Sequence, residues 1–266
     1  MTDAYVETTV LTDLLLKPNS KKQQRAKAAL TRYRKTFLPV YSIKEMKAGP
    51  LDTFAFVHDK LVQTQSLADT IQWISELPNL TYLKPTATEA FAAAGQTAKP
   101  RPAKYTVLGD GDKDHADSYR FSLASLIMRS WKKRRKITTQ VVDNLLCYLE
   151  SAPRLRKDGL FDLSPQECEK DEECCLASRL KADPKVLEAL REAIPSNSIR
   201  KEDTRRRQAL RQLIKHPNEV VTREICRDLG DAIFAFFCPE NTIILTTNLR
   251  DHGPLAKAIG KGAETP

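Results

Sequence analysis

The apolar positions in the first fifty residues predict alternating short strands and helices. Residues 4–6 form a short apolar run that is typical of a buried strand, and the sequence TTVLTDLLL after it turns toward a helix. Asn19 or Ser20 is placed to cap the next helix. Apolar residues recur on one face of that helix at three- and four-residue spacing: Ala26, Leu30, Tyr33 and Phe37. A second strand is expected at residues 40–43, VYSI, before a short helix.

The middle of the chain is predicted to be mainly helical, with prolines between its segments. Helices are expected at residues 53–62, 66–77, 118–131, 138–149, 165–180, 184–193 and 199–215. A strand is expected at residues 80–84, whereas residues 85–117 are rich in helix breakers and predict irregular structure. The sequence GDGDKD within that stretch is not followed by the full ligand pattern of a calcium loop, so it indicates a turn.

The last fifty residues return to alternating strand and helix. Gly230 and Asp231 suit the start of a helix, and residues 232–237 are apolar nearly all round. After a break that contains a proline, residues 242–247 predict a buried strand. Alternation at both ends of the chain predicts the α/β class, with a parallel sheet that carries helices on both faces.

Composition and charge are typical of a globular protein that binds a polyanion. The 266 residues are 41% hydrophobic and 29% charged, and no apolar run approaches the roughly 18 residues that cross a bilayer. The start, MTDAYVETTV, lacks the character of a signal peptide, so we expect a cytoplasmic protein with its six cysteines reduced and no structural zinc. The net charge is +9, and basic residues cluster in residues 14–44, in RSWKKRRK and in RKEDTRRRQALRQLIK. Three such clusters favour nucleic acid over idle solvated faces.

Polar side chains stand at the ends of the predicted strands, where open parallel sheets bind their ligands. Glu7 and Glu45 each follow a strand, Asp231 opens the helix beside the last strand, and Asn248 follows that strand. Taken singly, Glu45 is typical of a solvated helix start, Asn248 of a turn and Asp228 of a helix cap. Together they predict a site for Mg²⁺ or Mn²⁺, which prefer oxygen ligands and retain several waters. The four histidines have no zinc spacing, and we expect them at the surface or hydrogen-bonded: His58, His115, His216 and His252.

The order of these motifs resembles that of the PIN-domain family of metal-dependent ribonucleases. In that family an acid follows the first strand in a pattern like Asp-Thr-Ser, and this chain has Glu7 in YVETTVLTDLL. A second acid opens the helix after the second strand, as Glu45 does in YSIKEMKAG, and a third begins an apolar helix, as Asp231 does in GDAIFAFF. The last motif, a strand that ends in Thr-x-Asn before an Asp, matches ILTTNLRDHG, which supplies Thr246, Asn248 and Asp251. The match covers residues 1–50 and 218–260, with Glu7 in place of the usual aspartate and His252 where a Phe is common.

The resemblance implies a three-layer α/β/α fold with a central parallel sheet and a discontinuous PIN-like core at residues 1–84 and 218–266. Residues 85–217 would form a mainly helical, basic insertion that partly completes this core. The implied enzyme is an endoribonuclease that hydrolyses phosphodiester bonds in RNA. Its Mg²⁺ or Mn²⁺ would be bound by Glu7, Glu45, Asp231 and Asn248, with Asp251 added to the catalytic set. Contacts to nucleic acid are predicted for the basic clusters: Lys132, Lys133, Arg134, Arg135, Arg205, Arg206 and Arg207.

Two other classes of function remain open at the level of sequence. One is a non-catalytic nucleic-acid-binding protein with a degenerate PIN core, which Glu7 and the basic helical region motivate. The other is a scaffold whose basic faces meet an acidic partner protein. For the enzyme itself, the setting is open among a toxin–antitoxin pair, phage defence and RNA processing. An antitoxin or other protein partner and a homodimer are compatible with each setting.

Overall fold

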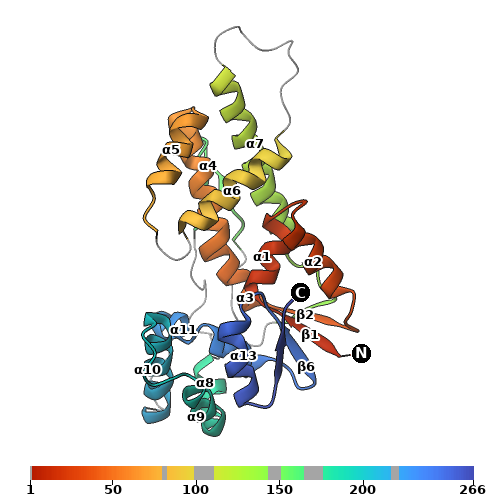
Figure 1. Ribbon diagram of the computed structural model, residues 1–266, viewed down its shortest axis with the longest axis vertical. Coiled ribbons are helices and arrows are strands. Elements are labelled where there is room, and N and C mark those ends of the chain that lie inside the picture. The colour runs from red at the N-terminus through yellow and green to blue at the C-terminus, as the bar shows by residue number, and fades with distance from the viewer. Residues whose placement is uncertain (1, 80–82, 99–110, 143–150, 165–175, 217–221) are drawn as a thin grey trace.

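A parallel sheet lies at the centre of the molecule. The computed structural model describes residues 2–79, 83–98, 111–142, 151–164, 176–216 and 222–266. Its five-stranded sheet has the strand order β3-β2-β1-β6-β7 (Figure 1). The strands are β1 (Asp3–Val6), β2 (Thr36–Pro39), β3 (Gln140–Val142), β6 (Thr242–Leu245) and β7 (Gly262–Glu264). Every neighbouring pair is parallel, so the carboxyl ends of the strands share one edge.

Helices cover both faces of the sheet and give the chain a three-layer α/β/α fold, as the sequence pattern predicts. On one face lie α1 (Thr8–Leu16) and α2 (Lys21–Leu30), and α1 contacts the helical lobe formed by α4 (Asp52–Thr64), α5 (Leu67–Glu76), α6 (Leu83–Thr97) and α7 (Gly111–Lys133). On the other face lie α8 (Leu176–Lys181), α9 (Pro184–Glu192), α10 (Lys201–Lys215), α11 (Arg223–Leu229), α12 (Asp231–Phe237) and α13 (Leu249–Ala258). Between the faces run α3 (Val40–Met46) and the π-helix η1 (Lys47–Leu51).

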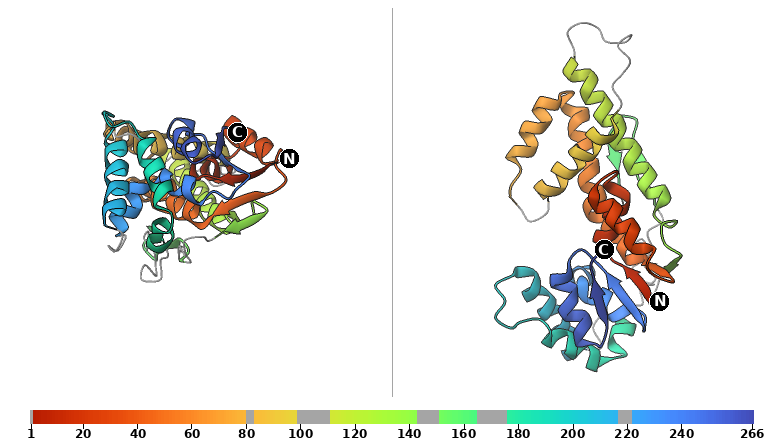
Figure 2. Two further views of the ribbon diagram at one scale, coloured as in Figure 1. Left: turned by 90° about the horizontal axis from the view of Figure 1, so that it is seen from below. Right: turned by 45° about the vertical axis from the view of Figure 1, so that its right-hand side comes forward.

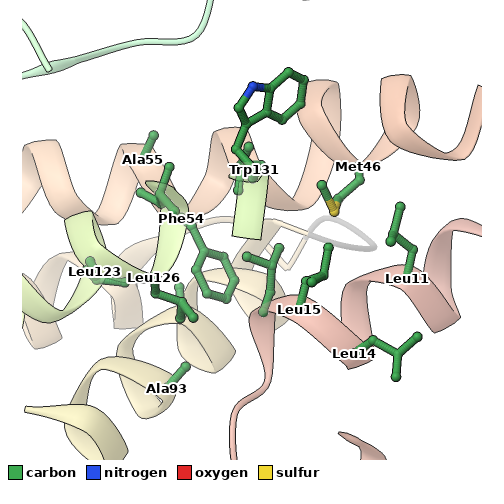
Figure 3. Close-up of a cluster of buried hydrophobic side chains, with 14 of the residues drawn as sticks. Leu11, Leu14, Leu15, Met46, Phe54, Ala55, Ala93, Leu123, Leu126 and Trp131 are labelled. Atoms are coloured by element: carbon green, nitrogen blue, oxygen red, sulfur yellow. The ribbon is translucent and has the colours of Figure 1, made fainter. Parts of the chain in front are cut away.

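Two hydrophobic cores stabilise these layers. Because side chains alternate along a strand, Ala4 and Val6 of β1 enter the first core, whereas Tyr5 enters the second. The first core joins α1 to the helical lobe α4–α7, and Figure 3 shows Phe54 and Leu126 within it. Figures 1 and 2 show this lobe extending beyond the sheet. A small antiparallel pair, β4 (Arg154–Leu155) and β5 (Phe161–Asp162), packs against α4.

The expected insertion at residues 85–217 contributes to both cores. It supplies strand β3 to the sheet, most of α6 and α7 to the first core, and α8–α10 to the second. None of the helices within the described ranges combines the length and the apolar character needed to cross a membrane.

Local sequence signals explain where several helices begin. The Ser20 hydroxyl accepts a hydrogen bond from the Gln23 backbone N–H and caps α2, and Ser66 caps α5 in the same way. Asp183 caps α9, whose first residue is Pro184. Gly230 precedes α12 with a φ of 41°, in the left-handed region that favours glycine.

Several sequence expectations were wrong. The helix expected to reach Phe37 ends at Leu30, and Phe37 lies in β2. Residues 40–43 are the start of α3 instead of a strand, because the strand precedes them at Thr36–Pro39. The stretch expected to be irregular holds α6 and the start of α7.

Two further segments also differ, and parts of others cannot be compared. Residues 140–142 form β3 where a helix was expected, and Leu83 begins α6 where a strand was expected. Residues 80–82, 99–110, 143–150 and 165–175 of the expected segments lie outside the described residues.

Candidate active site

Glu7 and Glu45 lie together at the carboxyl edge of the sheet. Glu7 follows β1 directly and is 4% exposed, and its carboxylate accepts hydrogen bonds from the hydroxyls of Thr9 and Thr246, the latter at 3.0 Å. Glu45 lies on α3, the helix that follows β2, and accepts a hydrogen bond of 2.5 Å from the Thr8 hydroxyl. Glu7 is the N-cap residue of α1, yet its side chain makes no capping bond within the described part of the chain. Threonine hydroxyls therefore orient both carboxylates.

Asp231 reaches the same region from α12. Its Oδ2 accepts a hydrogen bond of 2.6 Å from Nη2 of Arg206, a residue of α10 that is 7% exposed. Its Oδ1 lies 3.3 Å from Nε2 of His252. The turn before Asp231 favours glycine, because the φ of Gly230 is positive and a side chain there would be strained. Asp231 is thus the first residue of α12 and pairs with side chains, whereas Gly230 holds the cap position.

The acids influence one another's protonation. Burial raises the pKa of Glu45 to about 8, and the charges on Glu7 and Asp231 raise it as well, against the lowering effect of the Thr8 hydrogen bond. Burial also raises the pKa of Glu7, opposed by the charge on His252 and the bond from Thr9. Burial works in the same sense on Asp231, but His252 and Arg206 hold the pKa of that carboxyl below its usual range. These couplings place Glu7, Glu45 and Asp231 in one electrostatic unit.

His252 is part of this unit, which the sequence did not predict. The ring is fully buried and packs edge-on against Phe234 with ring centroids 5.5 Å apart. Neither ring nitrogen has an aligned hydrogen-bond partner among the described residues, so the ion pair with Asp231 is its polar contact. Burial lowers its pKa, but Asp231, Glu7 and Glu45 together raise it above the ordinary value. The expectation of a surface or hydrogen-bonded histidine was wrong here. It was right for His58, which bonds Asp59, and for the exposed His115 and His216.

Asn248 and Asp251 form a neighbouring group. Asn248 Nδ2 donates to Asp251 Oδ2 at 2.9 Å, and both guanidinium Nη atoms of Arg200 donate to the same carboxylate. These contacts lower the pKa of Asp251 to about 2, with the Arg200 hydrogen bond as the main cause. The backbone N–H of Asn248 donates to the Thr246 hydroxyl, which links this group to Glu7. Asp228, expected to cap a helix, lies instead in the last turn of α11 beside Arg227.

The oxygen atoms of the predicted metal ligands are of the kind that a hard divalent cation prefers, but their side chains would have to move to bind one ion together. Carboxylate and amide oxygens are the ligands that Mg²⁺ and Mn²⁺ prefer. In this arrangement no three His, Cys, Asp or Glu side chains within the described ranges lie close enough to hold a metal ion. Arg206 and His252 occupy the carboxylate of Asp231, and Asn248 bonds Asp251. Of the predicted metal ligands, Glu7 and Glu45 are hydrogen-bonded to threonine hydroxyls. Asp231 could bind the same cation only after it leaves Arg206.

The predicted nucleic-acid contacts divide between two places. On α10, Arg205 is exposed, Arg206 pairs with Asp231, and Arg207 donates to the backbone carbonyls of Arg191 and Ile194. The other cluster lies at the end of α7 and just beyond it, where Lys132, Lys133 and Arg135 are exposed and the Arg134 guanidinium lies 3.7 Å from the centre of the Trp131 ring.

The end of α7 lies toward the amino edge of the sheet. The Ser130 hydroxyl donates to the carbonyl of Leu15, near the end of α1, and Thr139 bonds Thr36 at the start of β2. Helix α1 begins beside the acids at Thr8 and runs away from them. Of these two clusters, the one on α10 adjoins the acids.

Two features of this site had no clear signal in the sequence. Arg206 and Arg200 belong to a basic run that predicts phosphate contacts, and the sequence gives no sign that they pair with core aspartates. The second feature is the set of threonine hydroxyls that orient the glutamates. The sequence ETT at residues 7–9 gave a weak signal for it, since hydroxyls next to an acid are suited to orient that acid.

Comparison of the chain with protein-family models, with curated proteins and with solved structures gives no match. The fold and the geometry of its carboxyl edge therefore carry the functional argument.

Proposed function

We propose that this protein is a Mg²⁺- or Mn²⁺-dependent nuclease of the PIN type that hydrolyses phosphodiester bonds in RNA. The observation that supports it most is the gathering of Glu7, Glu45 and Asp231, from segments far apart in sequence, at the carboxyl edge of a parallel sheet. Burial and the charge on Asp231 raise the pKa of both Glu7 and Glu45, and a divalent cation bound beside these two carboxyls would stabilise their ionised forms.

The residues of the chain have separate roles in this proposal. Glu7, Glu45 and Asp231 would hold the cation, and the Thr8, Thr9 and Thr246 hydroxyls keep the two glutamates in place. A bound Mg²⁺ or Mn²⁺ would supply the charge that activates water and offsets charge on the leaving oxygen. Asn248 and Asp251 lie beside these acids and complete the polar lining.

The choice of a polyanionic substrate rests on the basic helix beside the acids. Helix α10 carries Arg205, Arg206 and Arg207, and it contacts the start of α12 through Arg206. RNA as the preferred nucleic acid follows from the resemblance to PIN domains. A toxin, a phage-defence effector and an RNA-processing enzyme all fit this chemistry, as do an antitoxin partner and a homodimer.

A second function is a nucleic-acid-binding protein without catalysis. The ion pair between Arg206 and Asp231 favours it, because a guanidinium can permanently neutralise a carboxylate that no longer binds a cation. The two functions differ in cleavage, which only the first produces.

The test is cleavage of end-labelled single-stranded RNA by purified protein, with Mn²⁺ or with a chelator. The wild-type protein should cleave only with Mn²⁺, and Asp231→Asn should lose cleavage while it keeps its fold. Asp228→Asn is the matched control, because Asp228 is a nearby, partly buried aspartate whose Oδ1 lies 3.9 Å from Arg227. Full cleavage by Asp231→Asn would contradict the assignment. RNA binding without cleavage in the wild-type protein would favour the second function.

A further inference from the structure

A pocket of about 370 Å³ adjoins the candidate active site between α10 and α13. Three arginines line it: Arg200 precedes α10, Arg206 lies on α10, and Arg250 lies on α13. The pocket also contains the carboxylates of Asp203 and Asp251. Its remaining walls include apolar side chains: Ile194, Pro195, Pro254 and Leu255. A hollow of this size with several guanidinium groups is suited to an anionic ligand.

Two of these arginines are paired with acids of the candidate site. Arg200 bonds Asp251 through both of its Nη atoms, and Arg206 bonds Asp231 at 2.6 Å. Arg206 is buried, and its Nε has no hydrogen-bond partner within the part of the chain that the structure describes. Arg200 and Arg206 of the pocket therefore form ion pairs with Asp251 and Asp231 of the candidate active site.

This pairing constrains any ligand that binds on one side alone. A cation that takes Asp231 from Arg206 leaves a buried guanidinium whose remaining counter-charge is the carboxylate of Asp203, 3.9 Å from its Nη1, and the loss of the closer partner is unfavourable. A phosphate group that takes Arg206 from Asp231 leaves a partly buried carboxylate that is paired with His252 alone. When both ligands are present, the cation neutralises the carboxylates and the phosphate neutralises the arginines, so no charge is left unpaired.

We propose that the pocket lined by Arg200, Arg206 and Arg250 binds a phosphate of the polynucleotide backbone, and that Arg206 exchanges Asp231 for this phosphate as a divalent cation binds the acids. The proposal rests on the proposed function for the cation site. It adds a phosphate subsite on α10 and α13, and it makes cation binding and substrate binding depend on each other. Protein without substrate would then hold its cation weakly.

Binding measurements test this coupling without reference to cleavage. The affinity for MnCl₂ is measured alone and with a saturating, nuclease-resistant phosphorothioate oligouridylate, after subtraction of the Mn²⁺ that the oligonucleotide binds. An uncharged methylphosphonate oligonucleotide of the same length is the ligand control. We expect the phosphorothioate to tighten Mn²⁺ binding by about tenfold or more, Mn²⁺ to tighten oligonucleotide binding by the same factor, and the methylphosphonate to have no effect.

Variants of α10 then assign the coupling to Arg206. Arg206→Gln should bind Mn²⁺ more tightly than the wild-type protein when no oligonucleotide is present, and its coupling factor should fall toward one. Arg211→Gln removes an equal charge from an exposed position of the same helix and should keep the wild-type coupling. If Arg206→Gln does not fold, the reciprocal pair of affinities in the wild-type protein still decides whether coupling exists.

The outcomes separate the two proposals. Wild-type Mn²⁺ binding that Asp231→Asn abolishes, but that the phosphorothioate leaves unchanged, would overturn the phosphate subsite and leave the nuclease standing. Coupling that persists in Arg206→Gln would overturn the exchange in the same way. Absence of any Asp231-dependent Mn²⁺ site, with or without oligonucleotide, would overturn both proposals.

Discussion

Replacement of Glu45 by glutamine should stabilise the fold in the absence of metal. The folded state raises the pKa of this carboxyl from 4.5 to about 8, chiefly through burial, so folded protein binds a proton that unfolded protein releases. The contribution of this carboxyl to the unfolding free energy is therefore greatest below pH 4.5, and it is lost as the pH rises toward 8. The slope is about 1.4 kcal/mol per pH unit, and the full shift corresponds to at most about 5 kcal/mol. We expect Glu45→Gln to gain roughly 2 to 4 kcal/mol at pH 8 and much less at pH 5.

Urea unfolding between pH 5 and pH 9, with a chelator present, measures this difference. Glutamine can still accept the hydrogen bond that Thr8 donates at 2.5 Å, so the variant removes the charge and keeps the contact. Glu188→Gln is the matched control, because Glu188 is an exposed glutamate on α9. Unfolding curves for Glu45→Gln that follow the wild-type pH dependence would refute the idea that this partly buried carboxylate lies beside other acids.

Two other predictions concern His252 and the basic end of α7. His252→Phe should keep the fold, because an aromatic ring at this position packs against Phe234. It should also raise the pKa of Asp231, because His252 lowers that pKa. An unchanged Asp231 titration in ¹³C NMR would contradict this prediction. Replacing three exposed basic residues at the end of α7 and just after it together by alanine should reduce the log–log salt slope of RNA binding by about 0.7 per lost phosphate contact, with the cation requirement unchanged. These residues are Lys132, Lys133 and Arg135. An unchanged slope would indicate that this end of α7 meets a protein partner or solvent.

The strands of the sheet were partly predictable because their apolar runs are short and bounded. Residues 40–43 are an exception, because they predicted a strand but form the start of α3, a helix that is buried on two sides. Val40 and Tyr41 enter the second core, whereas Ile43 and Met46 enter the first, so no helical periodicity is visible in the sequence. Helix α6 was missed because Pro85 and a run of alanines resemble a linker, although proline is tolerated in the first turn of a helix.

The residues of the candidate site were also only partly predictable from the sequence. The order of the acids along the chain locates Glu7, Glu45 and Asp231 near strand ends, and parallel pairing of β1, β2 and β6 then places them at one edge. The partners of those acids could not be predicted, because Arg206 and His252 reach Asp231 through tertiary packing of α10 and α13. A basic run in a sequence indicates a polyanion and does not reveal which arginine is already paired.

The central claim is that the acids at the carboxyl edge hold a catalytic cation, and anomalous diffraction from Mn²⁺ tests it most directly. Crystals grown with MnCl₂ and a nuclease-resistant phosphorothioate oligonucleotide would be measured at a wavelength where manganese scatters anomalously. The account predicts an anomalous peak bounded by the carboxylates of Glu7, Glu45 and Asp231, with Arg206 turned away from Asp231. Saturating Mn²⁺ with no peak among these three carboxylates, and with Arg206 still bonded to Asp231, would contradict it.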